Sequence, residues 1–229
     1  MDVAIVGGTG KEGFGLALRL LGAGHRVTIG SRSAERAADA VARAREALGD
    51  DVRVEGGENA AAVLGAQVVV VTVPFAGMIE IYESIAPALQ SGQVVLDATS
   101  PLMSAVGGKA WEAIRPWHGS AGELAASLVP EGVSVVAGFH TIGAHALAAL
   151  DREIDSDALL CGDDEDAKRL VGELIDSVPG MRWVDAGPLA NARITEPLTA
   201  MIITINRRYK VRDGGFRFTG RDSWGAPTT

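Results

Sequence analysis

The sequence predicts an α/β protein built on a doubly wound, mostly buried parallel sheet, with a smaller C-terminal α/β portion that ends in a long apolar helix. Hydrophobic strands alternate along the chain with helical segments, which is the pattern of repeated βαβ units. Residues 68–73 form an unbroken run of β-branched residues, all valine except Thr72, typical of a strand buried on both faces. Only 5% of the residues are aromatic and 29 are glycine, which favours close packing of helices on a sheet.

The predicted elements follow in order. Strands are expected at residues 3–6, 27–29, 68–73, 94–97 and 133–137, with helices over the leucine-rich stretch before Gly22 and over residues 34–48. Residues 101–120 are rich in glycine and proline and are expected to form a loop-rich insertion. Further on, short strands at 159–161 and 182–184 flank a helix over 165–178.

The last predicted element is one long helix over residues 188–209. It carries an apolar stripe, and Pro197 is expected in an early turn or at a kink. The stripe is wide for a helix that covers one small domain, so we expect it to form the interface of a homodimer. Its residues are Ile194, Leu198, Met201, Ile202 and Ile205. Residues 213–229 are expected to form a mobile tail or a partner-binding arm.

Composition argues against several classes of protein. The net charge of −8 disfavours a general nucleic-acid binder, because such affinity comes from Lys and Arg contacts with phosphates. A single cysteine, Cys161, allows neither an internal disulfide nor a multi-cysteine zinc site, and is expected to be buried. No apolar stretch reaches the roughly 20 residues of a membrane span, and the chain begins on a strand rather than a signal peptide. We therefore expect a cytoplasmic protein with no membrane partner and no metal site.

A glycine-rich loop follows the first strand. Gly8, Gly10 and Gly13 form a G-x-G-x-x-G pattern between a hydrophobic strand and an amphipathic helix. In dinucleotide-binding proteins these glycines allow a tight turn, a close approach of the pyrophosphate and tight packing of helix on strand, while N–H groups at the helix start hold the phosphates. The alternative is a purely structural connection. The pattern indicates a Rossmann-like dinucleotide-binding domain over residues 1–137, with residues 138–229 as the smaller portion.

The end of the second strand indicates which dinucleotide is bound. It contains Ser31 and Arg32 and lacks the acid that usually accepts hydrogen bonds from the ribose 2′-OH of NAD. A hydroxyl and a guanidinium suit a 2′-phosphate instead, and Arg36 lies one helical turn further on. The alternative is that Arg32 and Arg36 are ordinary solvated side chains on the protein surface. The prediction is NADP(H).

Two further segments lie where strands are expected to end at the ligand crevice. Val73 and Pro74 end the buried 68–73 strand and turn the chain towards that crevice; an ordinary strand-ending proline is the alternative. His140 follows the 133–137 strand and is either a catalytic group or a satisfied structural histidine. The acidic run 163–166 opens a helix, so capping explains it better than catalysis.

Longer strings resemble a known family. The segments VAIVGGTGKEGFGLALRLLGAGHRVTIGSR, TVPF, FHTI, CGDDEDAKRLVGELI and VDAGPLANARITEPLTAMIITIN together resemble the NADPH-dependent coenzyme F420 reductase family, from residue 1 to about residue 218. The most specific are the AGPLANAR and CGDD strings. Members of that family pass a hydride between NADP(H) and the 8-hydroxy-5-deazaflavin coenzyme F420.

The resemblance implies roles for particular residues. It places Thr9, Gly10, Lys11 and Glu12 on the pyrophosphate and Ser31, Arg32 and Arg36 on the 2′-phosphate. It also places Val73, Pro74 and Ala137 beside the cofactor, and His140 and Ile142 where the two rings meet. NADP(H) and F420 are then the small-molecule partners, and the C-terminal portion completes the deazaflavin site.

Two alternatives remain open from the sequence. The same N-terminal unit would serve an NADPH-dependent reductase of another small acceptor, such as an imine, a flavin or a metal chelate. It would also serve a non-enzymatic redox sensor that binds NADP(H) and signals through its C-terminal arm.

Overall fold

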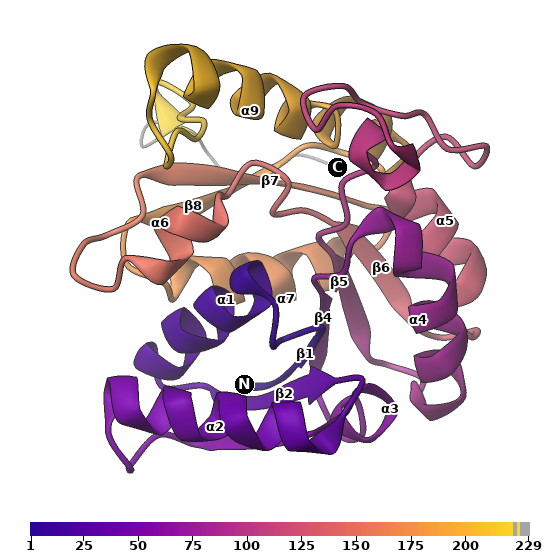
Figure 1. Ribbon diagram of the computed structural model, residues 1–229. Helices are drawn as coiled ribbons and strands as arrows, with labels where there is room; N and C mark the ends of the chain where they lie inside the picture. The colour runs from indigo at the N-terminus through magenta and orange to yellow at the C-terminus, as the bar shows by residue number, and fades with distance from the viewer. Residues whose placement is uncertain (222–223, 225–229) are drawn as a thin grey trace.

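A single eight-stranded sheet runs through the protein. The computed structural model describes residues 1–221 and 224 (Figure 1). The strands lie in the order β3-β2-β1-β4-β5-β6-β7-β8, and all neighbouring pairs are parallel except β6 and β7. Their bounds are β1 Asp2–Val6, β2 Arg26–Ser31, β3 Val54–Glu58, β4 Val68–Val71, β5 Val94–Asp97, β6 Ser134–Ala137, β7 Ser156–Gly162 and β8 Met181–Asp185. The predicted doubly wound sheet is confirmed, with one antiparallel step after β6.

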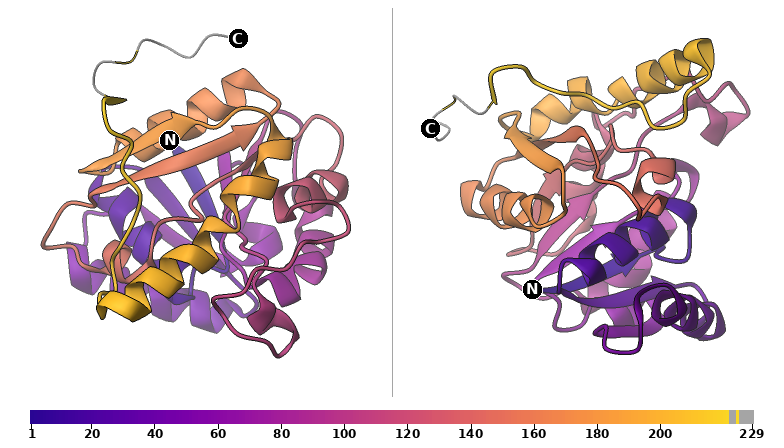
Figure 2. Two further views of the ribbon diagram at one scale, coloured as in Figure 1. Left: turned by 90° about the horizontal axis from the view of Figure 1, so that it is seen from above. Right: turned by 90° about the vertical axis from the view of Figure 1, so that its left-hand side faces the viewer.

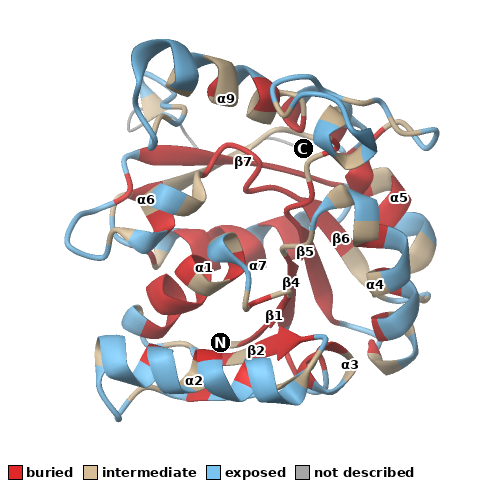
Figure 3. Ribbon diagram, in the orientation of Figure 1, coloured by how far each residue is buried: buried red, intermediate tan, exposed pale blue. Residues whose placement is uncertain are grey.

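Helices cover both faces of this sheet (Figures 1 and 2). One apolar cluster joins the sheet to α1 (Lys11–Gly22), α2 (Ala34–Leu48), α6 (Ala144–Ala148) and α7 (Glu165–Asp176). The other joins it to α4 (Met78–Ile85) and α5 (Ala121–Leu128), while α3 (Asn59–Ala62) packs beside β2 and β3. The valines of β4 alternate between the two clusters and are all fully buried, as Figure 3 shows for the sheet centre. The valine run therefore forms a central strand because both its faces are covered.

The sheet order creates a crevice at one edge. The chain proceeds from β1 outwards to β2 and β3, then returns to the other side of β1 to form β4. Connections therefore diverge between β1 and β4, at the carboxyl ends of the strands, which is where ligands bind in open α/β sheets. The glycine-rich loop, Ser31 and the Val73–Pro74 turn all follow these strands.

The predicted single helix over residues 188–209 is wrong. The segment forms a 3-10 turn at Leu189–Asn191, the short helix α8 (Ala192–Thr195) and then α9 (Leu198–Tyr209). Pro197 lacks the N–H that a continuous helix needs, and the buried carboxyl group of the preceding Glu196 accepts backbone N–H groups at the start of α5.

The break also divides the predicted apolar stripe. Ile202 is buried and Leu198 is half-buried. Ile194, Met201 and Ile205 are exposed, as is Tyr209 at the end of α9. The exposed apolar surface of this segment is therefore smaller than the sequence predicted, because only part of the stripe faces solvent.

Part of the predicted tail is fixed to the sheet. The amide of Asp157 in β7 donates to the carbonyl of Phe216 (2.7 Å), and the buried Asp157 carboxylate binds Arg217 and Arg182. Residues up to 218 thus lie against β7. Residues 222–223 and 225–229 of the predicted arm lie outside the described residues.

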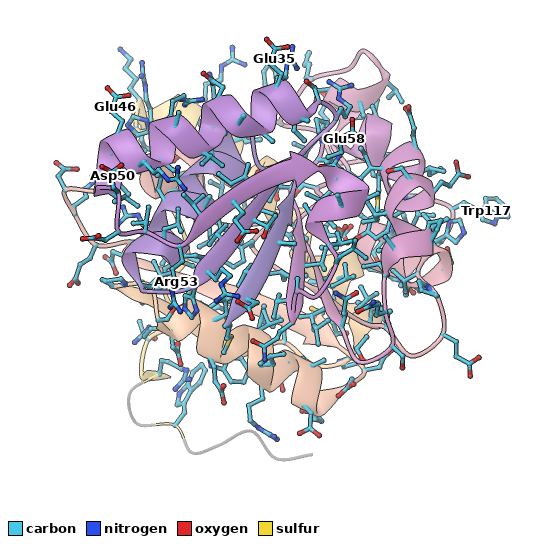
Figure 4. All side chains as sticks on the ribbon, turned by 90° about the horizontal axis from the view of Figure 1, so that it is seen from below. Glu35, Glu46, Asp50, Arg53, Glu58 and Trp117 are labelled. Carbon is cyan, nitrogen blue, oxygen red and sulfur yellow. The ribbon has the colours of Figure 1, made fainter. Side chains whose placement is uncertain are left out.

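The 101–120 insertion is irregular, as predicted. It contains a short 3-10 turn at Met103–Val106 and one bridge between Leu102 and Ala113. Trp111 lies against the guanidinium of Arg207 from α9, with 4.3 Å between the charge and the ring centre. Trp117 is almost fully exposed and projects from the body of the protein (Figure 4). The insertion is therefore attached to α9 at one point and open to solvent at another.

Candidate coenzyme site

The glycine-rich loop has the tight geometry that its sequence predicts. The Gly8 amide points at two carbonyls, those of Gly30 (2.9 Å) and Ile5 (3.1 Å). A Cβ on Gly8 would lie 2.8 Å from the Ile5 carbonyl oxygen, and a Cβ on Gly13 would lie 2.5 Å from Thr72 Oγ1. Glycine is thus required at both positions by the packing of the loop on β1 and β4.

A cavity of about 460 Å³ opens beside this loop. Most of the residues predicted to bind the dinucleotide line this cavity. Its volume lies in the range of ligand pockets. The predicted residues that line it are Thr9, Gly10, Ser31, Arg32, Arg36, Val73 and Pro74. Gly8, Lys11, Glu12, Ala137, His140 and Ile142 do not line it. The cavity is also lined by six residues that the sequence reasoning missed, namely Gly7, Asn59, Thr72, Gly77, Glu80 and Ile81.

The end of β2 provides hydroxyl and cationic groups to the cavity. Ser31 is buried, and its Oγ accepts the amide of Ser33 at 3.4 Å. The side chains of Arg32 and Arg36 are exposed and form no ion pair with any residue that the structure describes. Two guanidinium groups without partners are therefore available to an anionic ligand.

Asn59 connects the third strand to the glycine-rich loop. This 95% buried side chain accepts the Gly7 amide through Oδ1 (3.3 Å) and lines the cavity. Its Nδ2 donates to no described residue, so it offers N–H donors to a ligand. The sequence signal was weak because Asn59 follows β3, whose Val-Glu-Gly-Gly-Glu sequence has no strand-like apolar pattern.

His140 lies outside the 460 Å³ cavity, on the loop after β6. It is only 7% exposed, yet neither ring nitrogen has a hydrogen-bond partner among the described residues. Burial lowers its pKa to about 4, and the backbone of Ala98 offsets only part of this effect. The ring is therefore neutral at pH 7, with one N–H donor and one acceptor.

The backbone around His140 is unusual. Phe139 adopts φ +68°, a conformation rare for a bulky side chain, and the Ile142 amide closes the turn on the Phe139 carbonyl (3.0 Å). The Thr199 hydroxyl donates to the His140 carbonyl (2.7 Å). The amides of His140 and Thr141 donate to no described residue, whereas that of Ile142 is already used.

A second cavity of about 170 Å³ lies between the insertion and the α8–α9 junction. It is lined by Pro101, Ala113, Ile114, Arg115, Gly119, Arg193, Glu196 and Pro197. Its position relative to His140 follows from hydrogen bonds, because Thr199 binds both the His140 carbonyl and the Ser100 hydroxyl (2.8 Å). The loop after β5, the loop after β6 and α9 therefore meet at this point.

Two other sequence predictions can be compared with the structure. Cys161 is fully buried, as expected. Asp164 caps α7 by accepting the amides of Asp166 and Ala167, which confirms the capping interpretation of the acidic run. Within residues 1–221 and 224, no helix is long and apolar enough to cross a membrane, and no group of three or more acidic, His or Cys side chains is arranged to hold a metal ion.

Comparisons with known proteins identify the family of the chain. Residues 2–101 match the family described as "NADP oxidoreductase coenzyme F420-dependent". The F420-dependent NADP reductase of Methanothermobacter thermautotrophicus is 42% identical to the chain over 221 residues, which cover 96% of this chain and 95% of that relative. The chain belongs to the F420-dependent NADP reductase family.

Two other F420-dependent NADP reductases also match nearly the whole of this chain. The enzyme of Methanocaldococcus jannaschii is 36% identical over 222 residues, covering 96% of this chain and 98% of that relative. A solved structure from Arthrobacter sp. FB24, described as a candidate F420-dependent NADP reductase, matches with a TM-score of 0.80 and 25% identity over 96% of this chain and 99% of that one. The family resemblance predicted from sequence strings is thus confirmed over nearly the full chain.

Proposed function

We propose that the protein transfers a hydride reversibly between NADP(H) and coenzyme F420. The observation that carries the proposal is the 460 Å³ cavity that joins the glycine-rich loop to Ser31, Arg32 and Arg36. These residues fit a dinucleotide with a 2′-phosphate, because backbone amides face its diphosphate and unpaired guanidinium groups face the extra anion. The names of the relatives supply the second coenzyme.

In this proposal the NADP(H) site extends from Arg32 to the Val73–Pro74 turn. Arg32, Arg36 and Ser31 hold the 2′-phosphate, and the backbone of Thr9–Glu12 lies under the diphosphate. Val73 and Pro74 border the nicotinamide, and Ala137 ends β6, which is separated from β4 by β5.

The acceptor site in this proposal lies around His140 and Ile142, towards the second cavity. The free amides of His140 and Thr141 and the neutral ring of His140 are hydrogen-bond donors that would polarise the deazaflavin as it accepts electrons. Ile142 contributes an apolar wall, since its own amide is used within the turn.

The two coenzymes supply the redox chemistry when bound: two electrons pass with a hydrogen from one ring to the other. The protein holds the rings at a reacting distance of about 3–3.5 Å. It also keeps water away, for which the buried side chains of Phe139 and Ile142 are suited. His140 is uncharged at pH 7, so it acts by orientation and hydrogen bonding rather than as a cationic acid.

One assay tests the function and separates the alternatives. Purified protein is mixed anaerobically with NADPH and oxidised F420, and both absorption bands are followed. Parallel loss of the two bands supports the proposal. Loss of the nicotinamide band only with an imine, a flavin or a metal chelate indicates a different reductase. Binding of NADPH without turnover of any acceptor indicates a sensor.

We further propose that the protein is a cytoplasmic homodimer. NADP(H) is a coenzyme of the cytoplasm, and Ile194, Met201, Ile205 and Tyr209 leave an exposed apolar face on α8 and α9. Light scattering at micromolar concentration tests the second point, and a monomeric mass would contradict it. Met201→Lys is expected to shift a dimer towards monomer, because it places a charge on that face.

A further inference from the structure

Helix α1 connects the two parts of the proposed site. It continues directly from the glycine-rich loop, and the amide of Phe14 in its first turn donates to the carbonyl of Gly10 (2.8 Å). Further along, α1 packs against α6 (Figure 1). The short helix α6 begins at Ala144, two residues after Ile142, so it continues from the loop that carries His140. One helix thus supports both loops.

The two helices approach each other most closely at Gly15 of α1. A Cβ at this buried glycine would lie 2.8 Å from the Cβ of Leu147, a distance at which one of the two helices must shift. Leu147 is fully buried, in the same apolar cluster as Leu16 and Leu20 of α1, whereas its neighbours in α6 are partly or fully exposed. The absence of a side chain at Gly15 therefore sets how closely α6 lies on α1.

Arg19, one turn further along α1, binds the other end of α6. Its side chain is only 7% exposed, and its guanidinium donates to backbone carbonyls at and just after the end of that helix. The acceptors are the carbonyl oxygens of Ala146 (3.0 Å), Leu147 (3.0 Å), Ala149 and Arg152 (2.9 Å). The last carbonyls of a helix have no partner within the helix, so this planar group of N–H donors satisfies several of them together.

These bonds do more than fill space between the helices. A helix of five residues is too short to be stable by itself, so the position of α6 depends on what it packs against. Apolar side chains alone would allow α6 to slide along α1. The directional N–H groups of Arg19 instead fix the register of α6 on α1, in a buried place where an unpaired carbonyl is costly.

We propose that Gly15 and Arg19 are positioning residues that set the distance between the two coenzyme rings. Gly15 fixes the closeness of α6 to α1, and Arg19 fixes its register. A displaced α6 shifts the loop with His140 and Ile142 relative to the glycine-rich loop. Hydride transfer needs the reacting carbons about 3–3.5 Å apart, and a misplacement of about 1 Å lowers its rate about 100-fold. The inference rests on the proposed function, since it requires both rings in place.

Gly15→Ala tests the distance between the helices. Alanine favours a helix more than glycine does, so this variant is expected to fold. Its Cβ displaces α6 rather than α1, because Leu16 and Leu20 anchor α1 in the core. The single-turnover rate of hydride transfer at saturating coenzymes is expected to fall about 10- to 100-fold, with the Kd of NADPH nearly unchanged. Gly22→Ala is the matched control, because a Cβ at this exposed end of α1 would meet no atom within 4 Å.

Arg19→Met tests the register without any coenzyme. Methionine fills a similar space but donates no hydrogen bond, so α6 and the loop before it lose their attachment to α1. Amide hydrogen exchange in residues 139–149 of the coenzyme-free protein is expected to quicken about tenfold, as for loss of one or two hydrogen bonds. Exchange in residues 7–14 should stay as in the parent. Arg19→Lys, which keeps a charged donor, should lie between Arg19→Met and the parent.

The outcomes separate this inference from the proposed function. Hydride transfer at the parent rate in Gly15→Ala, an equal loss in Gly22→Ala, or unchanged exchange in Arg19→Met overturns the inference while leaving the function intact. A matching loss of NADPH affinity in Gly15→Ala also overturns it, because α1 itself would then be displaced. Failure of the parent to transfer a hydride overturns the function instead.

Discussion

The hydroxyl oxygens of Thr9 and Ser31 lie 3.5 Å apart, so the glycine-rich loop and the end of β2 meet at a pair of neutral polar groups. In an NAD-specific site this strand end would carry a carboxylate. Here the residues that line the cavity beside this strand end include the exposed Arg32 and Arg36. The contact therefore defines the place at which selectivity between NADP(H) and NAD(H) is expected to arise.

Arg32→Ala is expected to weaken NADPH binding selectively. Loss of a charge-assisted, bidentate contact with phosphate corresponds to a rise in Kd of about 10- to 100-fold. The Kd of NADH should change by less than about twofold, because NADH has no 2′-phosphate. Fluorescence titration with both coenzymes measures the two effects. Arg45→Ala, at an exposed position in the last turn of α2, is the control. Equal weakening of NADPH and NADH by Arg32→Ala would contradict this assignment.

Asn59→Ala is expected to weaken NADPH and NADH binding to a similar degree. The side chain holds the Gly7 amide and offers Nδ2 to the cavity, features that do not depend on the 2′-phosphate. A rise in Kd of about 5- to 30-fold is expected for each coenzyme, as for loss of one to two hydrogen bonds. Asn59→Asp tests the donor, since it keeps the acceptor and adds a charge that repels the diphosphate. Unchanged binding in both variants would exclude Asn59 from the site.

His140→Ala is expected to lower turnover with F420 about 10- to 100-fold while leaving the Kd of NADPH nearly unchanged, because His140 lies outside the coenzyme cavity. Its pKa near 4 predicts that the pH profile of the parent has no limb from His140 above about pH 5.5. Steady-state rates from pH 5.5 to 9 provide both readouts. Turnover of His140→Ala equal to that of the parent at every pH would remove His140 from the reaction.

Glu196→Gln is expected to change how stability depends on pH. Burial raises the pKa of Glu196 from 4.5 to about 8, so the folded chain keeps this proton at pH values where the unfolded chain has lost it. Stability therefore falls as pH rises from about 4.5 towards 8.

Between pH 6 and 8 this fall should be smaller in Glu196→Gln, by about 1–3 kcal/mol, because glutamine does not titrate. The variant also loses part of the double contact with the Ala121 and Gly122 amides and should be less stable overall. Urea unfolding at each pH measures the slope. Glu173→Gln, exposed on α7, is the control, and identical slopes in Glu196→Gln and the parent would refute the assignment.

The sequence predicted the regular parts of the fold because their signals are local. Residues 34–48 form α2 with the predicted bounds, since an Ala- and Arg-rich stretch begins after the capping Ser33 and ends at Gly49. The valine run at 68–71 was recognised because burial on both faces leaves no polar positions. The edge strand Val54–Glu58 was missed because it has exposed glutamates and glycines in place of an apolar pattern.

Features that depend on distant contacts could not be predicted in this way. The direction of β7 relative to β6 is set by packing rather than by either strand's composition. Pro197 indicated an early turn or a kink but not the end of one helix and the start of another, because the partners of Glu196, Ala121 and Gly122, lie some 75 residues earlier in the chain. The same limit applied to the site: the glycines and arginines follow a known motif, whereas the position of Asn59 beside the glycine-rich loop depends on strand order.

Direct transfer between the two rings is the central claim, and isotope labelling tests it most directly. NADPH carrying deuterium on C4, in each stereochemical form in turn, is mixed anaerobically with oxidised F420 and the protein in ordinary water. The account predicts that one of the two forms delivers its deuterium to C5 of the reduced deazaflavin, with one label transferred per NADPH consumed. Reduced F420 without deuterium from either form, or no reduction of F420 at all, would contradict it.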